Sequence, residues 1–356
     1  MLFGYPIEAT AENWLHECLR AVLQLIHANI ETEKPLPVWA EMIPDPYRNR
    51  LKSRTGLRDK LKAYQTALTK LSATEQNRVL QAFNEQNKIA LLLSGQCDCD
   101  TITDLPSAIR APVKALFKYA FDLLTDPDLE IRDQHYHVIY KSMPSRVCPF
   151  CGYHPFSATG SRREALDHYL AESKYPFAGS NLRNLVPMCN KCNSGYKLAQ
   201  NMLYRTDGTR RKSFDPYNCS GIQLSLENSK PFAGTLTPTG QLPQWKIEFS
   251  PNTEEVTTWD EVFHIRERYE RDVLNEEFKS WLVNFKSWCH SAKVAPSSDE
   301  EWVDAINRYA TLHEDMGIGD RAFLKAAVFR MLQVHCQNGD QRLIKLIRDV
   351  VIGVSM

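Results

Sequence analysis

The stretch that decides the fold begins at Cys148-Pro149-Phe150-Cys151 and ends at Cys189-Asn190-Lys191-Cys192. Each quartet is a C-x-x-C motif, and 37 residues separate the two. Two such turns allow four thiolates to face one ion at about 2.3 Å, the closed tetrahedral arrangement typical of structural zinc. The spacing therefore predicts one zinc site, with Cys148, Cys151, Cys189 and Cys192 as its ligands.

Disulfide bonds are the main alternative for these cysteines, and they would require export. The N-terminus lacks the basic segment and apolar core of a signal peptide. No run approaches the roughly 18 apolar residues of a membrane span. The sequence therefore predicts a cytoplasmic protein with no membrane association and reduced thiols. Cys97 and Cys99 could form a second metal clip, but a solvated turn is favoured.

The segment between the two C-x-x-C motifs carries the residues that could do chemistry. A closed site with four thiolates has no open coordination position, so a zinc ion there is structural. Residues 166–170, around Asp167-His168, alternate in polarity and predict a short strand. A helix is expected to start near Pro187 and to run to about Tyr204. The prediction is a hairpin, a loop and a helix, joined by the cysteines.

The order Asp167-His168, Asn184-Leu185 and Cys189-x-x-Cys192-Asn193, followed by Lys197, resembles the HNH endonuclease motif. The form it resembles has four zinc-binding cysteines and ends in Asn. The surrounding sequence is similar to one bacterial branch that is common in phage-defence gene clusters. This similarity covers about residues 146–217, and it includes Lys174-Tyr175-Pro176 and Phe214-Asp215-Pro216-Tyr217.

The resemblance implies a ββα-metal fold and one-metal hydrolysis of nucleic-acid phosphodiesters. His168 would be the general base, at a strand end exposed to water, and an unperturbed imidazole has a pKa of about 6.5. Asp167 and Asn193 would bind catalytic Mg²⁺ or Mn²⁺. Asn184 would orient the loop that carries the base, and Lys197 would contact phosphate. Ala171 and Glu172 depart from the family pattern, as does the four-residue step from Asn193 to Lys197, but no metal ligand or base is lost.

Charge is distributed unevenly along the chain. The whole sequence balances 43 basic against 43 acidic residues, whereas residues 141–217 hold 12 Lys or Arg against 5 Asp or Glu. A local basic excess is expected of a module that binds the phosphate backbone. We therefore expect DNA, most simply double-stranded, as the partner of this segment. Arg210-Arg211-Lys212 is a candidate for backbone contacts or a solvated turn.

The remaining sequence predicts an α+β protein that is mostly helical, with a small antiparallel sheet between helical flanks. An amphipathic pattern at 11–30, capping boxes at Ser72 and Ser298, and a helix at 106–124 interrupted near Pro112 support this. Trp259, Trp281, Trp288 and Trp302 are expected in the core. The predicted regions are a helical domain at 1–130, the HNH nuclease domain at 131–217, a β region at 218–257 and a helical region at 258–356.

The sequence is compatible with three functions. The first is a metal-dependent DNA endonuclease, a hydrolase regulated by a protein partner within an antiviral defence system. The resemblance implies that an ATPase encoded nearby is that partner. The second is a catalytically dormant HNH-fold subunit that binds DNA or acts as a scaffold. The third, a homing or restriction enzyme, is disfavoured because the flanks show no zinc-finger repeat and no basic recognition helix.

Overall fold

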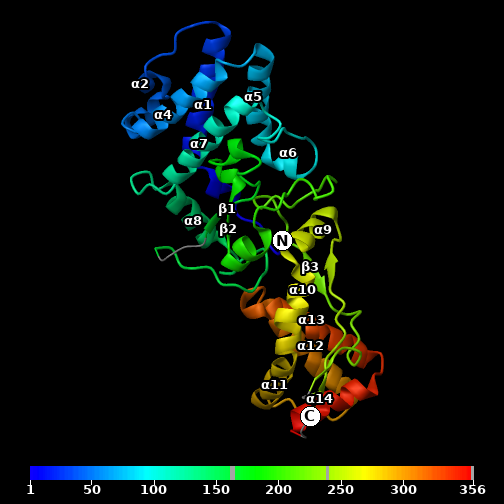
Figure 1. The fold of residues 1–356 in the computed structure, drawn as a ribbon. Coiled ribbons are helices and arrows are strands. Elements are labelled where there is room, and N and C mark those ends of the chain that lie inside the picture. The colour runs from blue at the N-terminus through cyan, green and yellow to red at the C-terminus, as the bar shows by residue number, and fades with distance from the viewer. Residues whose placement is uncertain (161–164, 238–239, 354–356) are drawn as a thin grey trace. The chain divides into compact units, whose positions relative to one another are not determined.

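The computed structural model describes residues 1–160, 165–237 and 240–353. The protein is α+β and mostly helical, with small two-stranded antiparallel sheets (Figure 1). Its chain forms two compact units. We call Gly4–Pro144 with Phe156–Ser220 the N-terminal unit, and Met1–Phe3, Ser145–Pro155 and Gly221–Met356 the C-terminal unit. None of the helices in the described part of the chain combines the length and apolar character of a membrane span.

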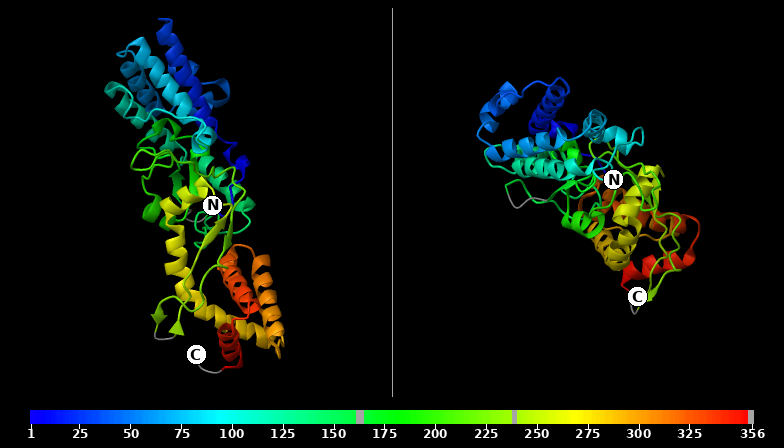
Figure 2. Two further views of the ribbon diagram at one scale, coloured as in Figure 1. Left: turned by 90° about the vertical axis from the view of Figure 1, so that its right-hand side faces the viewer. Right: turned by 45° about the horizontal axis from the view of Figure 1, so that its top comes forward.

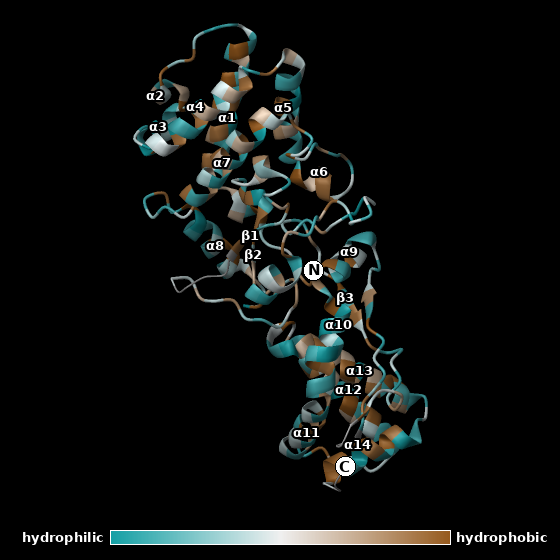
Figure 3. Cartoon of the chain, viewed as in Figure 1, coloured by the Kyte–Doolittle hydropathy of each residue, from teal (hydrophilic) through white to brown (hydrophobic). Residues whose placement is uncertain are grey.

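The N-terminal unit is built on amphipathic helices whose apolar faces share one core. Figure 3 shows both hydrophobic and hydrophilic residues along these helices. Helix α1 packs against α5, and α4 packs against α7 (Figures 1 and 2). The helices are η1 (Ile7–Thr10), α1 (Trp14–Glu31), α2 (Trp39–Met42), α3 (Asp45–Leu51), α4 (Thr55–Leu68), α5 (Ala73–Gln86), α6 (Ile89–Leu93), α7 (Ser107–Leu123) and α8 (Ile131–Ser142).

Local sequence signals account for some of these helices and not for others. The capping box at Ser72 is confirmed, because its backbone N–H donates to the Glu75 carboxylate at 2.9 Å and its hydroxyl accepts from the Glu75 N–H. The interruption expected near Pro112 is wrong, since α7 continues through it. A proline inside a helix costs about 3 kcal/mol. Burial of Val113, Leu116 and Phe117 on the same helix offsets that cost.

Residues 165–197 form a hairpin followed by a short helix. Strand β1 (Ala165–His168) pairs antiparallel with β2 (Leu185–Met188), and His168 lies opposite Leu185. Two 3₁₀ turns, η2 (Pro176–Ala178) and η3 (Leu182–Asn184), lie between the strands. The helix that follows is π-helical, η4 (Lys191–Lys197). It does not start near Pro187 as expected, because Pro187 pairs with Leu166 within β2. It also does not reach Tyr204, because Leu198 adopts φ 48° and its N–H closes the last turn on the Asn193 carbonyl at 2.9 Å.

The C-terminal unit contains the predicted β region and the last helices. Its β region is two separate antiparallel pairs rather than one sheet: β3 (Gln223–Ser225) with β6 (Glu248–Ser250), and β4 (Leu236–Thr237) with β5 (Gly240–Gln241). The helices, among which α12 and α13 pack together, are α9 (Glu254–Phe263), α10 (Ile265–Tyr269), η5 (Glu270–Leu274), α11 (Asn275–Ser291), α12 (Asp299–Asp315), η6 (Gly319–Arg321), α13 (Ala322–Gln337) and α14 (Gln341–Ile352).

The C-terminal unit contains the tryptophans predicted for the core and the second predicted helix cap. Trp259, Trp281 and Trp302 are buried, as predicted. Trp288 is only partly buried. Ser298 caps α12 by accepting from the Glu301 N–H. The reciprocal half of the box differs, since the Glu301 carboxylate accepts from the N–H of Ser297 at 2.6 Å.

Candidate functional site

Cys148, Cys151, Cys189 and Cys192 form a buried group, as their spacing predicts. Their sulfur atoms all lie within 4.8 Å of one another. Four ligands at about 2.3 Å from a tetrahedral zinc ion would be about 3.8 Å apart. The group could therefore bind a metal ion such as zinc. In the described ranges, Cys97 and Cys99 belong to no comparable group of Cys, His, Asp or Glu side chains.

The first C-x-x-C turn is fixed by its own backbone and by helices of the C-terminal unit. The N–H groups of Cys151 and Gly152 donate to the Cys148 carbonyl at 3.3 and 2.7 Å. Gly152 has φ 76°, and a Cβ there would come within 2.3 Å of Leu2. The indole of Trp259 donates to the Phe150 carbonyl at 2.9 Å. A buried aromatic residue thus supports the turn that presents the first two thiols.

The second C-x-x-C motif begins directly after β2 and leads into η4. The Cys192 N–H donates to the Cys189 sulfur at 3.4 Å. The Asn193 N–H donates to the Cys189 carbonyl at 3.0 Å. An N–H directed at sulfur stabilises the thiolate that a metal requires. Local folding of this segment therefore prepares the second pair of ligands.

His168 lies at the end of β1 and is partly buried, not exposed as expected. Its Nε2 lies 2.9 Å from the carbonyl oxygen of Gly179. A carbonyl only accepts, so Nε2 carries the proton and Nδ1 is the acceptor nitrogen of the neutral ring. The Phe121 ring covers the imidazole at a centroid distance of 4.4 Å. Burial lowers the pKa of His168 to about 4, well below the expected 6.5.

Asp167 precedes His168 and is paired with a buried lysine. The Lys197 ammonium lies 2.7 Å from the Asp167 carboxylate and donates to the His168 carbonyl at 2.7 Å. Lys197 is fully buried, so its ammonium faces the hairpin and not a phosphate in solvent. Burial raises the pKa of Asp167, and the Lys197 ammonium partly opposes that rise. The ion pair fixes η4 against β1.

Asn184 and Asn193 occupy different parts of this arrangement. Asn184 is fully buried, and its amide oxygen accepts from the Leu170 N–H at 2.6 Å. Its amide nitrogen donates to the carbonyls of Leu170 and Ala178 at 3.1 and 3.3 Å. Asn193 is partly buried on η4, four residues before Lys197. Its backbone carbonyl closes the last turn of η4 by accepting from the Leu198 N–H at 2.9 Å.

Two neighbours of His168 were not expected from the sequence. Gly179 contributes only a backbone carbonyl, which every residue has, so no sequence signal marks it. Phe121 lies in α7 among several other apolar residues, and nothing in the sequence marks it as the one that contacts His168. Both are recognised only once the hairpin has been placed against α7.

The basic excess of residues 141–217 is only partly a surface feature. Arg183 is paired with Asp215 at 2.5 Å. Arg210 is paired with Asp98 at 3.0 Å and also donates to backbone carbonyls, and Arg211 is buried. These arginines therefore stabilise the fold, which argues against the backbone-contact reading of 210–211. The exposed basic residues of the described segment include Lys174, Lys191 and Lys212.

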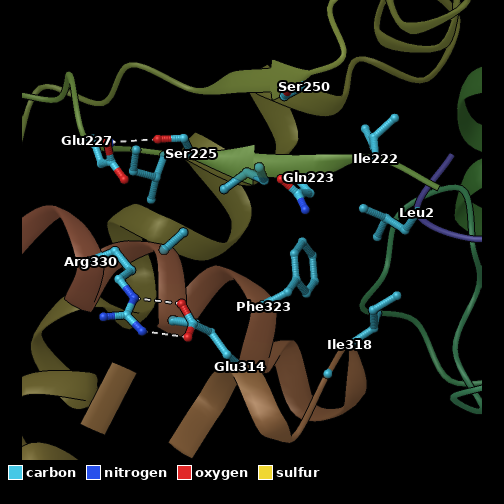
Figure 4. Close-up of a pocket in the computed structure, with 15 residues that line it drawn as sticks. Leu2, Ile222, Gln223, Ser225, Glu227, Ser250, Glu314, Ile318, Phe323 and Arg330 are labelled. Atoms are coloured by element: carbon cyan, nitrogen blue, oxygen red, sulfur yellow. Dashed lines mark hydrogen bonds and ion pairs between the residues drawn. The ribbon is translucent and has the colours of Figure 1, made fainter. Parts of the chain in front are cut away.

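A separate cavity of about 570 Å³ lies in the C-terminal unit. Figure 4 shows Leu2, Ile222 and Phe323 on its apolar side. The other side carries an ion pair between Arg330 and Glu314 at 2.6 Å. None of the predicted site residues lines this cavity.

Replacing Lys197 with methionine should lower the free energy of unfolding. The substitution leaves the Asp167 carboxylate, whose side chain is only 14% exposed, without its charged partner. Removing one member of a buried pair costs about 3 kcal/mol. Urea denaturation would measure the change, with Lys191→Met, an exposed lysine of the same helix, as the matched control. Equal stability of the two variants would contradict a stabilising role for the pair.

Comparison of the chain with protein-family models, curated proteins and solved structures gave no match.

Proposed function

We propose that the protein is an HNH-type endonuclease that hydrolyses DNA phosphodiester bonds with one divalent metal ion. The observation that carries the proposal is the hydrogen bond from His168 Nε2 to the Gly179 carbonyl, at the end of a hairpin that is followed by a short helix. This bond leaves Nδ1 free to accept a proton from water. A carboxylate (Asp167) and an amide (Asn193) come from the strand and the helix beside it.

Asp167 and Asn193 carry the oxygen atoms that a hard divalent cation prefers. Asp167 and Asn193 would hold Mg²⁺ or Mn²⁺, which prefer oxygen ligands and retain several waters. The Asp167 carboxylate already has a positive group, the Lys197 ammonium, 2.7 Å away. A metal ion there would have to compete with this ammonium for the carboxylate. When bound, the metal would stabilise negative charge on the phosphate and the leaving oxygen.

The roles of the chain's own residues follow from their contacts. His168 Nδ1 would take a proton from the water whose oxygen attacks phosphorus, while the bond from phosphorus to the 3′ oxygen breaks. The Gly179 carbonyl keeps the imidazole in the required tautomer and orientation. Asn184 fixes the backbone on both sides of the loop that follows β1. Phe121 restricts water on one face of the ring.

Three exposed lysines could contact the DNA backbone without reading its sequence: Lys174, Lys191 and Lys212. Regulation by a protein partner, including an ATPase within an anti-phage system, remains part of this proposal because of the resemblance described above.

One observation favours a second function, a dormant subunit that binds DNA or acts as a scaffold. The Asp167–Lys197 pair already satisfies the carboxylate, so the fold needs no catalytic metal for stability.

Nicking of supercoiled plasmid tests the proposed function. The wild-type protein should nick DNA with Mg²⁺ or Mn²⁺ at roughly millimolar concentration, because one carboxylate and one amide bind such ions weakly. Asn193→Ala should lose nicking and keep DNA binding. The matched control is Asn190→Ala, an exposed asparagine at the start of the same helix, which should nick normally.

Two outcomes of this assay would overturn the proposal in different ways. Cleavage in EDTA at the same rate would contradict the one-metal mechanism. Failure to cleave with either metal, also with a partner protein present, would favour the scaffold function.

A further inference from the structure

The loop between β1 and β2 contains buried polar contacts to helices far away in the sequence. Ser180 is fully buried, and Asn181 is 6% exposed. Gly179, whose carbonyl accepts from His168, precedes them directly. We call residues 175–184 the anchored loop. Its polar groups need partners because unpaired polar groups in the interior are costly.

Helix α5 and the residue after it hold the first half of the anchored loop. The Gln86 side-chain oxygen accepts from the Phe177 N–H at 3.0 Å, and its nitrogen donates to the Asp100 carbonyl at 2.8 Å. Asn87 donates to the Phe177 carbonyl at 3.3 Å. Gln86 is fully buried. Phe177 is thus held at both of its backbone polar groups, two residues before Gly179.

Helix α1 and its N-cap hold the second half. The Asn13 side-chain oxygen accepts from the Leu182 N–H at 2.9 Å. Asn13 and Asn87 both bond to the Asn181 side chain, at 3.2 and 2.9 Å. The His16 ring lies 3.1 Å from the Ser180 hydroxyl. Gly179 therefore lies between two fixed segments, one held by α5 and the other by α1 and α5 together.

We propose that Gln86, Asn87 and Asn13 are positioning residues for His168. They fix the backbone on both sides of Gly179, and the Gly179 carbonyl in turn selects the Nε2-protonated tautomer of His168. A buried polar network of this kind specifies one conformation when all its members are paired. The effect on catalysis rests on the proposed function, but the effect on the tautomer does not. The N-terminal helices thereby act on the site through the loop.

The test combines nitrogen NMR of ¹⁵N-histidine-labelled protein with the nicking assay. Wild-type His168 should show a protonated Nε2 and an unprotonated Nδ1 at pH 8, assigned by the loss of these signals in His168→Gln. Asn87→Ala and Gln86→Leu should give a mixture of tautomers. Their kcat should fall about tenfold or more, with KM for DNA and zinc content unchanged. Gln81→Ala, an exposed residue of α5, is the matched control and should match the wild type.

Wild-type tautomer and kcat in both folded variants would overturn the inference. Gln86→Leu removes a buried amide and could fail to fold, in which case Asn87→Ala, only partly buried, decides. If the wild-type protein cleaves no DNA, the proposed function fails. The NMR signals would still show whether Gln86 and Asn87 determine the tautomer of His168.

Discussion

Cys148→Ser is expected to yield little folded, soluble protein. A serine hydroxyl does not replace the thiolate, so the group of four ligands becomes three. Binding of a structural zinc contributes about 10–16 kcal/mol, and this is folding free energy because the unfolded chain has no site. Domains are stable by only about 5–15 kcal/mol in total. Losing even part of the zinc contribution should therefore unfold the segments that the cysteines join.

Elemental analysis and circular dichroism measure this effect. The wild-type protein, purified without chelators, should contain about one zinc per chain. Cys97→Ser is the matched control, since Cys97 undergoes the same chemical change outside the four-cysteine group and should keep both zinc and helicity. Wild-type protein without tightly bound metal would contradict the prediction. A Cys148→Ser variant that retains full zinc and wild-type stability would contradict it equally.

The cysteine group was predictable because the C-x-x-C spacing alone identifies its four metal ligands. Each C-x-x-C turn presents two thiols from four residues, and no other element has to be known. The cap at Ser72 was predictable for the same reason. Pro112 and Leu198 were not, because burial of α7 and closure of η4 override what these residues prefer alone. Packing of the folded chain thus decides that α7 continues past Pro112 and that η4 ends before Leu198.

The candidate site was likewise predictable only in part. The motif gave the order of Asp167, His168, Asn184 and Asn193, and the hairpin and helix that carry them follow from that order. It gave no sign that Lys197 turns inward to Asp167, because ion pairing depends on how η4 meets β1. It also gave no sign of Gly179 or the anchored loop, whose partners Gln86 and Asn87 lie more than 90 residues away at the end of α5. Contacts made by backbone carbonyls leave no pattern in a sequence.

His168→Ala should reduce DNA cleavage by about 10²–10⁴-fold, the usual contribution of a general base. The variant also loses the contact with Phe121 and the bond to the Gly179 carbonyl. A net loss of about 1 kcal/mol in stability is therefore expected. Zinc content and DNA binding should not change, since the cysteines and exposed lysines are untouched. Nicking rates and urea denaturation measure the two effects separately.

The pH dependence of cleavage tests whether His168 accepts a proton during catalysis. Burial lowers its pKa from 6.5 to about 4, so the imidazole is neutral and ready to accept a proton throughout the physiological range. Cleavage should show no loss near pH 6.5 and should fall only as pH drops toward 4. The free energy of unfolding should also fall in acid, because a depressed pKa contributes stability above pH 6.5 that is lost as pH falls through 4.

His168→Gln keeps a side-chain N–H for the Gly179 carbonyl and has no basic nitrogen. It should therefore retain more stability than His168→Ala and remain equally inactive, whereas wild-type cleavage by His168→Gln would assign the base to another residue.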